Sequence, residues 1–259
     1  MLRAVIFDYG NTLIGIDPST PSRRTDYADV VARPGAERLA SHLAERGLLD
    51  ARAEQMRFIG LYLKTREKNR LAAEVAGDEI TAEASLAEAL AEVGTPPAGS
   101  ALLHEAISVY FTAEEERIVA LDGAMETLEM LRATGVRIGL LSNATDGRYV
   151  ERVASRLGMR PFFDPFVVSA DIGVRKPRAE AFHAVLDRWA LPAEDVAMVG
   201  DSLYHDVAGA NRLGLYSVHF TQIANPGDPA YRDHVAPRAA ASSHAALRAA
   251  MTPLLNAAP

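Results

Sequence analysis

Short runs of apolar residues recur along the chain and are separated by longer stretches with helical periodicity. The runs are Arg3–Asp8, Arg137–Ser142, Phe166–Ser169, Val196–Gly200 and Tyr216–Phe220. Their nearly continuous apolar character predicts strands buried on both faces, as in a parallel sheet. Residues 124–134, 146–157, 178–189 and 206–213 lie between the later runs and predict helices. Strands alternating with helices are typical of a doubly wound α/β fold.

One long region breaks this alternation. From about Pro18 to Ile118 the sequence is rich in Ala, Leu and Glu and has no strand pattern. It predicts four helices, over residues 35–46, 51–75, 81–93 and 100–116. The flanking segments Ile16–Thr25 and Val119–Gly123 are expected to be hinges. We therefore expect a Rossmann-like core of residues 1–17 and 119–259 and an inserted helical domain of residues 18–118, with a last short strand and helix around Ser243–Leu255.

Composition and charge exclude several classes of function. The 259 residues are 49% hydrophobic and 24% charged, as in a soluble globular protein. The net charge of −7 argues against nucleic acid or an anionic membrane as the main partner. The chain has no cysteine, which excludes thiol catalysis and thiolate metal sites. Its first apolar run is too short for a signal peptide, and no segment is as long as a membrane span. We expect a cytoplasmic protein.

Polar side chains follow four of the predicted strands. They are Asp8 and Thr12 after the first strand, Ser142 and Asn143 after the second, Lys176 after the third, and Asp201 and Asp206 after the fourth. Ligands of open parallel sheets bind outside the carboxyl ends of the strands, so these side chains are expected to converge. Carboxylates suit Mg²⁺, and a hydroxyl and an ammonium group suit a phosphoryl group. The pattern predicts a magnesium-dependent phosphate site, at which a carboxylate can attack phosphorus.

Four segments in this order resemble the motifs of the haloacid dehalogenase-like (HAD) superfamily. They are Phe7–Leu13, Leu141–Asn143, Lys176–Pro177 and Gly200–Ala210. The helical insertion lies between the first two, where that superfamily places its C1-type cap. The resemblance covers essentially the whole chain, and the four motifs together are specific although each alone is weak. It implies a hydrolase with a Rossmann-like core and an α-helical cap.

The resemblance also implies a role for each motif residue. Asp8 would be the nucleophile and a metal ligand, and the main-chain carbonyl of Gly10 and the Asp201 carboxylate would complete the protein's share of the Mg²⁺ shell. Asp206 would ligate the metal or orient Lys176. Thr12, Ser142 and Asn143 would contact the phosphoryl group, while Lys176 would stabilise Asp8 and the developing charge.

Gly10 departs from the pattern of that superfamily. Most of its phosphatases carry an Asp there, which protonates the leaving group and then activates water. Losing general acid–base catalysis costs roughly 10²- to 10⁴-fold in rate. The substrate could instead have a leaving group that needs no proton, such as an acyl phosphate or a phosphoanhydride. Alternatively, a residue of the cap could supply the proton; the candidates are Arg23, Arg24, His42 and Lys64.

The leading hypothesis is Mg²⁺-dependent phosphoryl transfer from a small phosphorylated metabolite through phospho-Asp8. Two alternatives remain. A phosphonatase-like C–P hydrolase would use a cap lysine as a Schiff base, and only Lys64 and Lys68 are available. A catalytically impaired protein would bind phosphorylated ligands without turnover and have a regulatory role. A true haloacid dehalogenase fits less well, because such members need no metal and lack the acidic residue at the position of Asp201.

Overall fold

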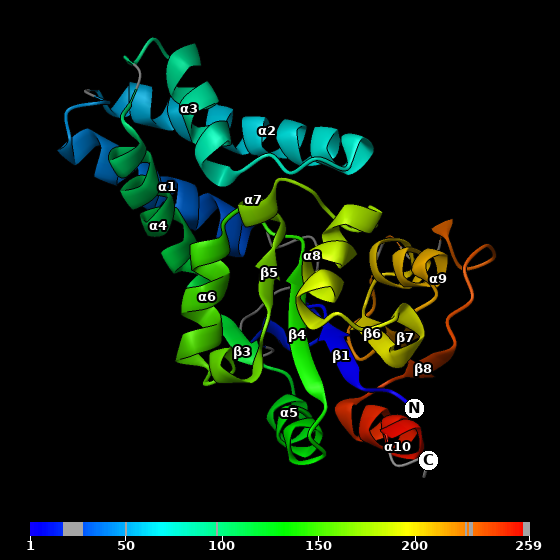
Figure 1. Cartoon of the computed structure of the whole chain (residues 1–259). Coiled ribbons are helices and arrows are strands. Elements are labelled where there is room, and N and C mark those ends of the chain that lie inside the picture. The colour runs from blue at the N-terminus through cyan, green and yellow to red at the C-terminus, as the bar shows by residue number, and fades with distance from the viewer. Residues whose placement is uncertain (18–27, 50, 97, 226, 228–229, 256–259) are drawn as a thin grey trace. The chain divides into compact units, whose positions relative to one another are not determined.

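The computed structural model places most of the chain in two compact units. It describes residues 1–17, 28–49, 51–96, 98–225, 227 and 230–255. The first unit comprises Met1–Gly15 and Val119–Pro259, and the second comprises Ile16–Ile118. The sequence of the second unit is thus inserted into that of the first, as the colours of Figure 1 show.

A six-stranded parallel sheet forms the centre of the first unit. Its order is β5-β4-β1-β6-β7-β8, and every neighbouring pair is parallel. The strands are β1 (Ala4–Phe7), β4 (Arg137–Ser142), β5 (Phe166–Val168), β6 (Val196–Gly200), β7 (Tyr216–Phe220) and β8 (Ala239–Ala241). The strand order reverses at β1, which has β4 on one side and β6 on the other. The predicted doubly wound α/β fold is confirmed, and the reversal marks the edge where such sheets bind ligands.

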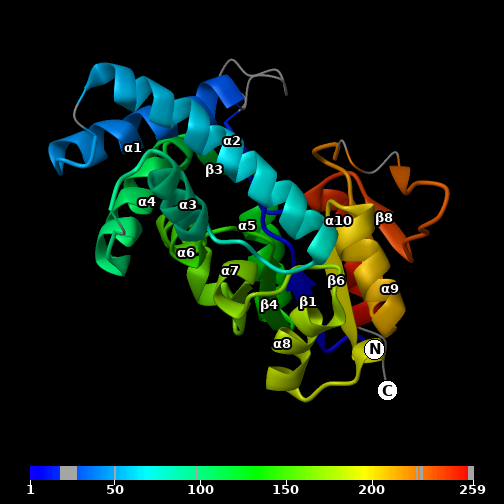
Figure 2. The same cartoon turned by 90° about the horizontal axis from the view of Figure 1, so that it is seen from above.

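Helices cover this sheet (Figures 1 and 2). They are α5 (Ala124–Ala133), α6 (Gly147–Arg156), α7 (Ser169–Ile172), α8 (Ala179–Trp189), α9 (Gly209–Leu213) and α10 (His244–Leu255). On one face, Ile6 of β1 and Met198 of β6 belong to a buried cluster with Phe182 and Val185 of α8. Ile6 is fully buried, and such apolar burial on both faces explains the unbroken apolar runs of the strands.

Helices make up most of the second unit within the part of the chain that the structure describes. They are a π-helical turn at Ala28–Ala32, α1 (Arg33–Glu45), α2 (Arg52–Ala76), α3 (Ala82–Glu92) and α4 (Ser100–Glu115). Contacts join α1 to α2 and α4, and α3 to α2 and α4. Tyr62 lies at the centre of an aromatic cluster, stacked on Phe58 at 5.8 Å and edge-on to Tyr110 at 5.3 Å between ring centroids. No helix in the described segments is long and apolar enough to cross a membrane.

Two short strands, β2 (Ile14–Ile16) and β3 (Ile118–Ala120), pair with each other where the chain passes between the units. Leu121 N–H donates to the Leu13 carbonyl at 2.9 Å, and Asp17 N–H donates to the Arg117 carbonyl at 2.8 Å. The sequence does not predict these strands, because three-residue strands give almost no periodic pattern, and the hinge role of these segments stays a prediction. Most of the first expected hinge, residues 18–25, lies outside the described residues.

His244 anchors α10 to the rest of the first unit. It is fully buried, and its ring nitrogens lie 3.1 Å from Thr127 Oγ1 and 2.9 Å from the Thr12 carbonyl oxygen. Burial lowers the pKa of His244 to about 4. The imidazole is therefore neutral in the folded protein at pH 7, with Nε2 donating to the Thr12 carbonyl.

This burial predicts a loss of stability in mild acid. Below about pH 6.5 the unfolded chain binds a proton at His244, while the folded protein does not until about pH 4. The contribution of neutral His244 to the free energy of unfolding is thus complete above pH 6.5. It is lost as the pH falls towards 4, which lowers the free energy of unfolding by up to roughly 3 kcal/mol. Urea unfolding at pH 7 and 4.5 should show a smaller loss in His244→Gln than in the wild type. His183→Gln, on the exposed face of α8, is the control. Equal losses in all three proteins would contradict this assignment.

Candidate functional site

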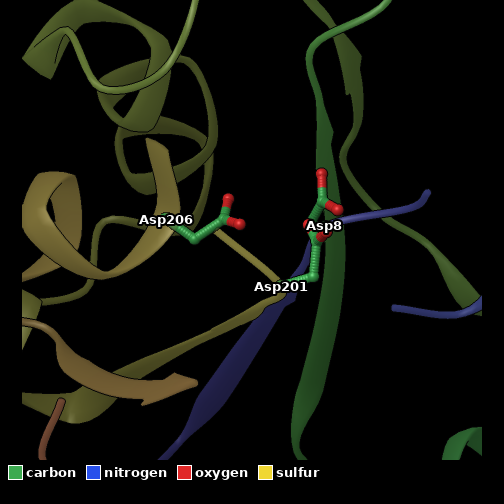
Figure 3. A group of neighbouring side chains, drawn as sticks. All are labelled: Asp8, Asp201 and Asp206. Carbon is green, nitrogen blue, oxygen red and sulfur yellow. The ribbon is translucent and has the colours of Figure 1, made fainter. Parts of the chain in front are cut away.

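Three aspartates meet at the carboxyl ends of β1 and β6. Asp8 directly follows β1 and Asp201 directly follows β6, which are neighbouring parallel strands. Asp206 lies in a π-helical turn, Leu203–Ala208, which continues into α9. One carboxylate oxygen from each side chain lies within 4.8 Å of the other two, and all three residues are buried (Figure 3). The structure therefore brings the three carboxylates of the first and fourth motifs together.

The sequence between Gly200 and Asp206 explains how the third carboxylate reaches the cluster. A Cβ atom at Gly200 would lie 2.2 Å from Cγ of Asp206, so only glycine leaves room for that carboxylate. Ser202 then fixes the turn, because its N–H donates to Asp206 Oδ2 at 3.0 Å and its hydroxyl accepts from the His205 N–H at 3.1 Å. The carboxylate of Asp206 is therefore held by the main chain of its own turn.

The turn after Asp8 places Thr12 against it. Asn11 adopts a left-handed conformation with φ 56°, which asparagine tolerates better than most residues. The Thr12 hydroxyl donates to Asp8 Oδ2 at 3.3 Å. Gly10 is exposed, its φ lies outside the left-handed region, and a Cβ added there would meet no atom within 4 Å. The role of the Gly10 carbonyl as a metal ligand stays a prediction.

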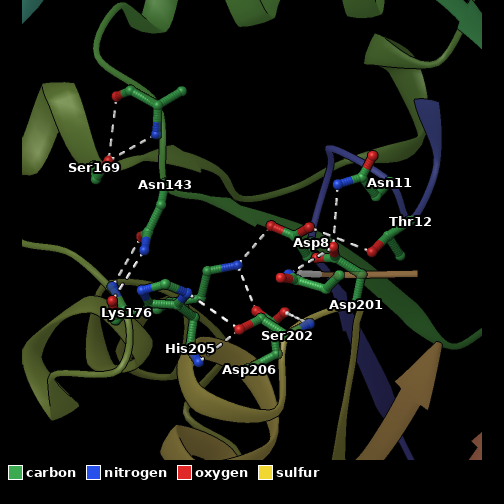
Figure 4. A network of polar contacts seen from close by, with 12 residues as sticks. Asp8, Asn11, Thr12, Asn143, Ser169, Lys176, Asp201, Ser202, His205 and Asp206 are labelled. Atoms are coloured by element: carbon green, nitrogen blue, oxygen red, sulfur yellow. Dashed lines mark hydrogen bonds and ion pairs between the residues drawn. The ribbon is translucent and has the colours of Figure 1, made fainter. Parts of the chain in front are cut away.

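Lys176 is the cation of the cluster. Its side chain is 1% exposed, and Nζ lies 2.7 Å from both Asp8 Oδ1 and Asp206 Oδ1 (Figure 4). Asn143 fixes the main chain of Lys176. Asn143 Oδ1 accepts from the Lys176 N–H, and Asn143 Nδ2 donates to the Lys176 carbonyl, both at 2.9 Å. Both polar groups of Asn143 are thus engaged by Lys176. A direct contact between Asn143 and a phosphate stays a prediction.

Ser142 lies at the end of β4, the strand beside β1. It is buried and in register with Val168 of β5. The loop after it is fixed by Ser169, whose hydroxyl accepts from the Ala144 N–H at 2.9 Å and donates to the Ala144 carbonyl at 3.2 Å (Figure 4). Ser142 therefore reaches the same edge of the sheet as Asp8, as the motif order implies.

Negative charge exceeds positive charge in this buried cluster. Burial raises the pKa of Asp201 to about 8, and repulsion from Asp8 and Asp206 adds to the effect. Burial also raises the pKa of Asp8. Burial by itself would lower the pKa of Lys176. Attraction to Asp206 and Asp8 outweighs this effect, so the pKa of Lys176 is raised. Burying an uncompensated charge is costly. An oxygen-preferring divalent cation would offset the excess, so the donor set fits Mg²⁺.

Two asparagines hold Asp201 in place. Asn11 Nδ2 donates to Asp201 Oδ2 at 3.1 Å, and Asn225 Nδ2 donates to the same oxygen at 3.0 Å. His219 Nε2 lies 3.3 Å from the Asp201 carbonyl oxygen. Sequence reasoning gave no role to these three residues. The only signal at Asn225 is the dipeptide Pro226-Gly227 that follows it, which indicates a turn rather than a site.

The candidate substitutes for the missing acid/base, and the two lysines that a phosphonatase-like reaction would use, belong to the helical unit. Arg23 and Arg24 lie outside the described residues. His42 in α1 has Nε2 3.8 Å from Glu105 Oε1. In α2, Lys64 is exposed, and Lys68 forms an ion pair with Glu88. A catalytic role for any of them stays a prediction.

The curated proteins that are similar to the chain in sequence include two sugar-phosphate phosphatases. A ribulose-1,5-bisphosphate 5-phosphatase of Halopiger xanaduensis is 37% identical over 128 residues, which are 49% of this chain and 52% of the relative. A glyceraldehyde 3-phosphate phosphatase of Methanocaldococcus jannaschii is 35% identical over 94 residues, which are 36% of this chain and 41% of the relative. The chain thus spans about half the length of the first relative and less of the second.

Solved structures and a family model extend the likeness beyond these segments. A 2-haloacid dehalogenase from Pseudomonas syringae pv. Tomato DC3000 has a TM-score of 0.65 at 23% identity, covering 99% of both chains. A HAD phosphatase from Thermococcus onnurineus has a TM-score of 0.61 at 17% identity, covering 96% of this chain and 98% of the other. At these identities the structures show the shared fold. The model of the haloacid dehalogenase-like hydrolases matches residues 2–214, and the chain belongs to that family.

Proposed function

We propose that the protein is a Mg²⁺-dependent phosphohydrolase or phosphotransferase that acts on a small phosphorylated metabolite through phospho-Asp8. The observation that carries this proposal is the buried cluster of Asp8, Asp201 and Asp206, with Lys176 Nζ 2.7 Å from Asp8 Oδ1. The substrate class is supported by the names of the relatives, which are phosphatases of ribulose-1,5-bisphosphate and of glyceraldehyde 3-phosphate. In this proposal residues 1–17 and 119–259 form the catalytic core, and residues 18–118 form a cap that selects the substrate.

The proposed reaction has two displacements at phosphorus. A carboxylate oxygen of Asp8 bonds to phosphorus while the bond from phosphorus to the leaving oxygen breaks. Water then attacks the phosphorus of phospho-Asp8, which releases inorganic phosphate and a proton and restores the carboxylate. A phosphotransferase would use a hydroxyl of a second substrate in place of water. Asp8 and Asp201 would hold Mg²⁺, which would supply positive charge to offset the charge of the phosphoryl group.

The other side chains of the site position the reacting groups. Lys176 and Thr12 bind different oxygens of Asp8 and so fix the plane of its carboxylate. Ser142 supplies a hydroxyl for a phosphoryl oxygen. We assign Asn143 an indirect role, because its amide holds the Lys176 main chain. Such fixed donors stabilise charge without reorganising during the reaction.

The open space at Gly10 indicates which substrates react fastest. No side chain at that position can protonate a leaving oxygen, and a Cβ there would meet nothing within 4 Å. Substrates whose leaving group is already a weak base, such as acyl phosphates and phosphoanhydrides, need no such proton. We therefore propose that these react faster than monoesters of simple alcohols.

Mg²⁺ binding should depend on Asp201. Removing one of the carboxylates takes away both a ligand and the charge that attracts the cation, so Asp201→Ala should weaken Mg²⁺ binding by more than roughly tenfold. Titration calorimetry measures this directly. Asp187→Ala, which removes a carboxylate whose side chain is 78% exposed on α8, is the matched control. An unchanged affinity in Asp201→Ala would contradict the metal assignment.

Beryllium fluoride, which mimics an acyl phosphate when bound to an aspartate, should report on Asp8. With Mg²⁺ present it should raise the melting temperature of the wild type, because it completes the buried cluster around Asp8. It should not raise that of Asp8→Ala, in which no carboxylate can hold it. Thermal melts with and without the fluoride test this, and Asp187→Ala should respond like the wild type. Equal stabilisation of Asp8→Ala would rule out Asp8 as the covalent site.

Restoring a carboxyl group at position 10 should speed the hydrolysis of poor substrates. Gly10→Asp introduces an acid/base beside the leaving oxygen, and the structure has space for it without backbone strain. Turnover of monoesters with poor leaving groups should rise by up to roughly 10²-fold. Acetyl phosphate should gain much less, since its leaving group needs little help.

Steady-state kinetics with both substrate types measures this difference. Gly99→Asp, at the start of α4, is the control for an added carboxyl group. If Gly10→Asp folds, binds Mg²⁺ and hydrolyses no monoester faster than the wild type, the missing acid/base does not limit the rate.

A further inference from the structure

Asp201 is held by a segment that lies outside the four motifs. Asn225 follows β7 in the sequence and lies beyond residue 214, where the match to the family model ends. Its Nδ2 donates to Asp201 Oδ2 at 3.0 Å, and Asn11 Nδ2 donates to the same oxygen at 3.1 Å. Two N–H donors occupy the lone pairs of that oxygen. The other oxygen of the carboxylate, Oδ1, is then the one left for a cation.

Hydrogen bonds fix both polar atoms of the Asn225 amide, Nδ2 and Oδ1. Its Oδ1 accepts from the Gly227 N–H at 2.9 Å, so the amide orientation that donates to Asp201 is the one that the turn requires. Its side chain is half-buried. Rotating the amide by half a turn would place its oxygen against the carboxylate and its NH₂ group against an N–H. The turn thus pre-orients the donor before any ligand binds.

A second contact joins the same segment to the turn that carries Asp206. The Tyr231 ring stacks on Tyr204 with 4.7 Å between centroids and 18° between ring planes. Tyr204 belongs to the π-helical turn Leu203–Ala208. The segment after β7 therefore contacts both sequence stretches that supply acidic residues of the fourth motif. A surface turn with no link to the site would need neither contact.

We propose that Asn225 is a positioning residue for the metal site, which fixes the Asp201 carboxylate so that one oxygen faces the divalent cation. This inference rests on the proposed function, because it assigns Asp201 to the metal. If it holds, metal affinity depends partly on the segment after β7, which lies outside the four motifs. Partners of metal ligands that do not touch the metal themselves typically change affinity 10- to 100-fold when they are lost.

The test compares Mg²⁺ affinity among variants of the full chain by titration calorimetry. Asn225→Ala removes the donor, and Asn225→Leu removes it while keeping a side chain of four heavy atoms branched at Cγ. Asn211→Ala is the matched control. Asn211 donates to the Ala236 carbonyl at 2.9 Å and accepts from the Ser217 hydroxyl at 2.7 Å, so it anchors the same segment without contacting an acidic residue. Urea unfolding of each variant reports any change in stability.

Both Asn225 variants should bind Mg²⁺ roughly tenfold more weakly than the wild type, while Asn211→Ala should bind as the wild type does. Wild-type affinity in Asn225→Ala and Asn225→Leu would overturn the inference and leave the proposed function standing. An equal loss in Asn211→Ala would also overturn it, because anchoring of the segment would then suffice as the explanation. Absence of Mg²⁺ binding to the wild type would instead overturn the proposed function.

Discussion

Three buried carboxylates around a single ammonium group are the constraint on which the site depends. The cluster has more negative than positive charge in a place where water cannot screen it, and the pKa of Asp201 rises to about 8 as a result. Lys176 offsets part of that charge through contacts of 2.7 Å with Asp8 and Asp206. The remaining negative charge is what a divalent cation would offset, and the proposed function rests on that fit.

The fold meets this constraint by placing short, rigid segments at one edge of the sheet. Parallel pairing puts the residues after β1 and β6 side by side, and Gly200 leaves the space that Asp206 fills. Side-chain amides then fix the main chain and carboxylate groups, as Asn143 does for Lys176 and Asn225 does for Asp201. Each of these contacts restricts the position of a charged side chain, which could otherwise move away from the neighbouring carboxylates.

The local pattern of apolar residues in the sequence predicted the fold well, but it could not reveal contacts between residues that are far apart in the sequence. The five apolar runs are strands within a residue or two of the expected ends, because burial on both faces requires an unbroken apolar sequence. Asp8, Asp201 and Lys176 were found because they directly follow such strands or lie in the loops after them. The pairing of β2 with β3, and the contacts of Asn225 with Asp201 and of His244 with Thr12, join residues whose sequence neighbours carry no periodic signal.

The position of β1 at the middle of the sheet has a consequence for how the protein is made. This strand is synthesised before both of its partner strands, which begin only at Arg137 and Val196, after the whole helical unit. The apolar stretch Ala4–Phe7 therefore cannot pair in the sheet until β4 has been synthesised, and closing such long loops slows folding. An unpaired apolar strand is also prone to aggregate.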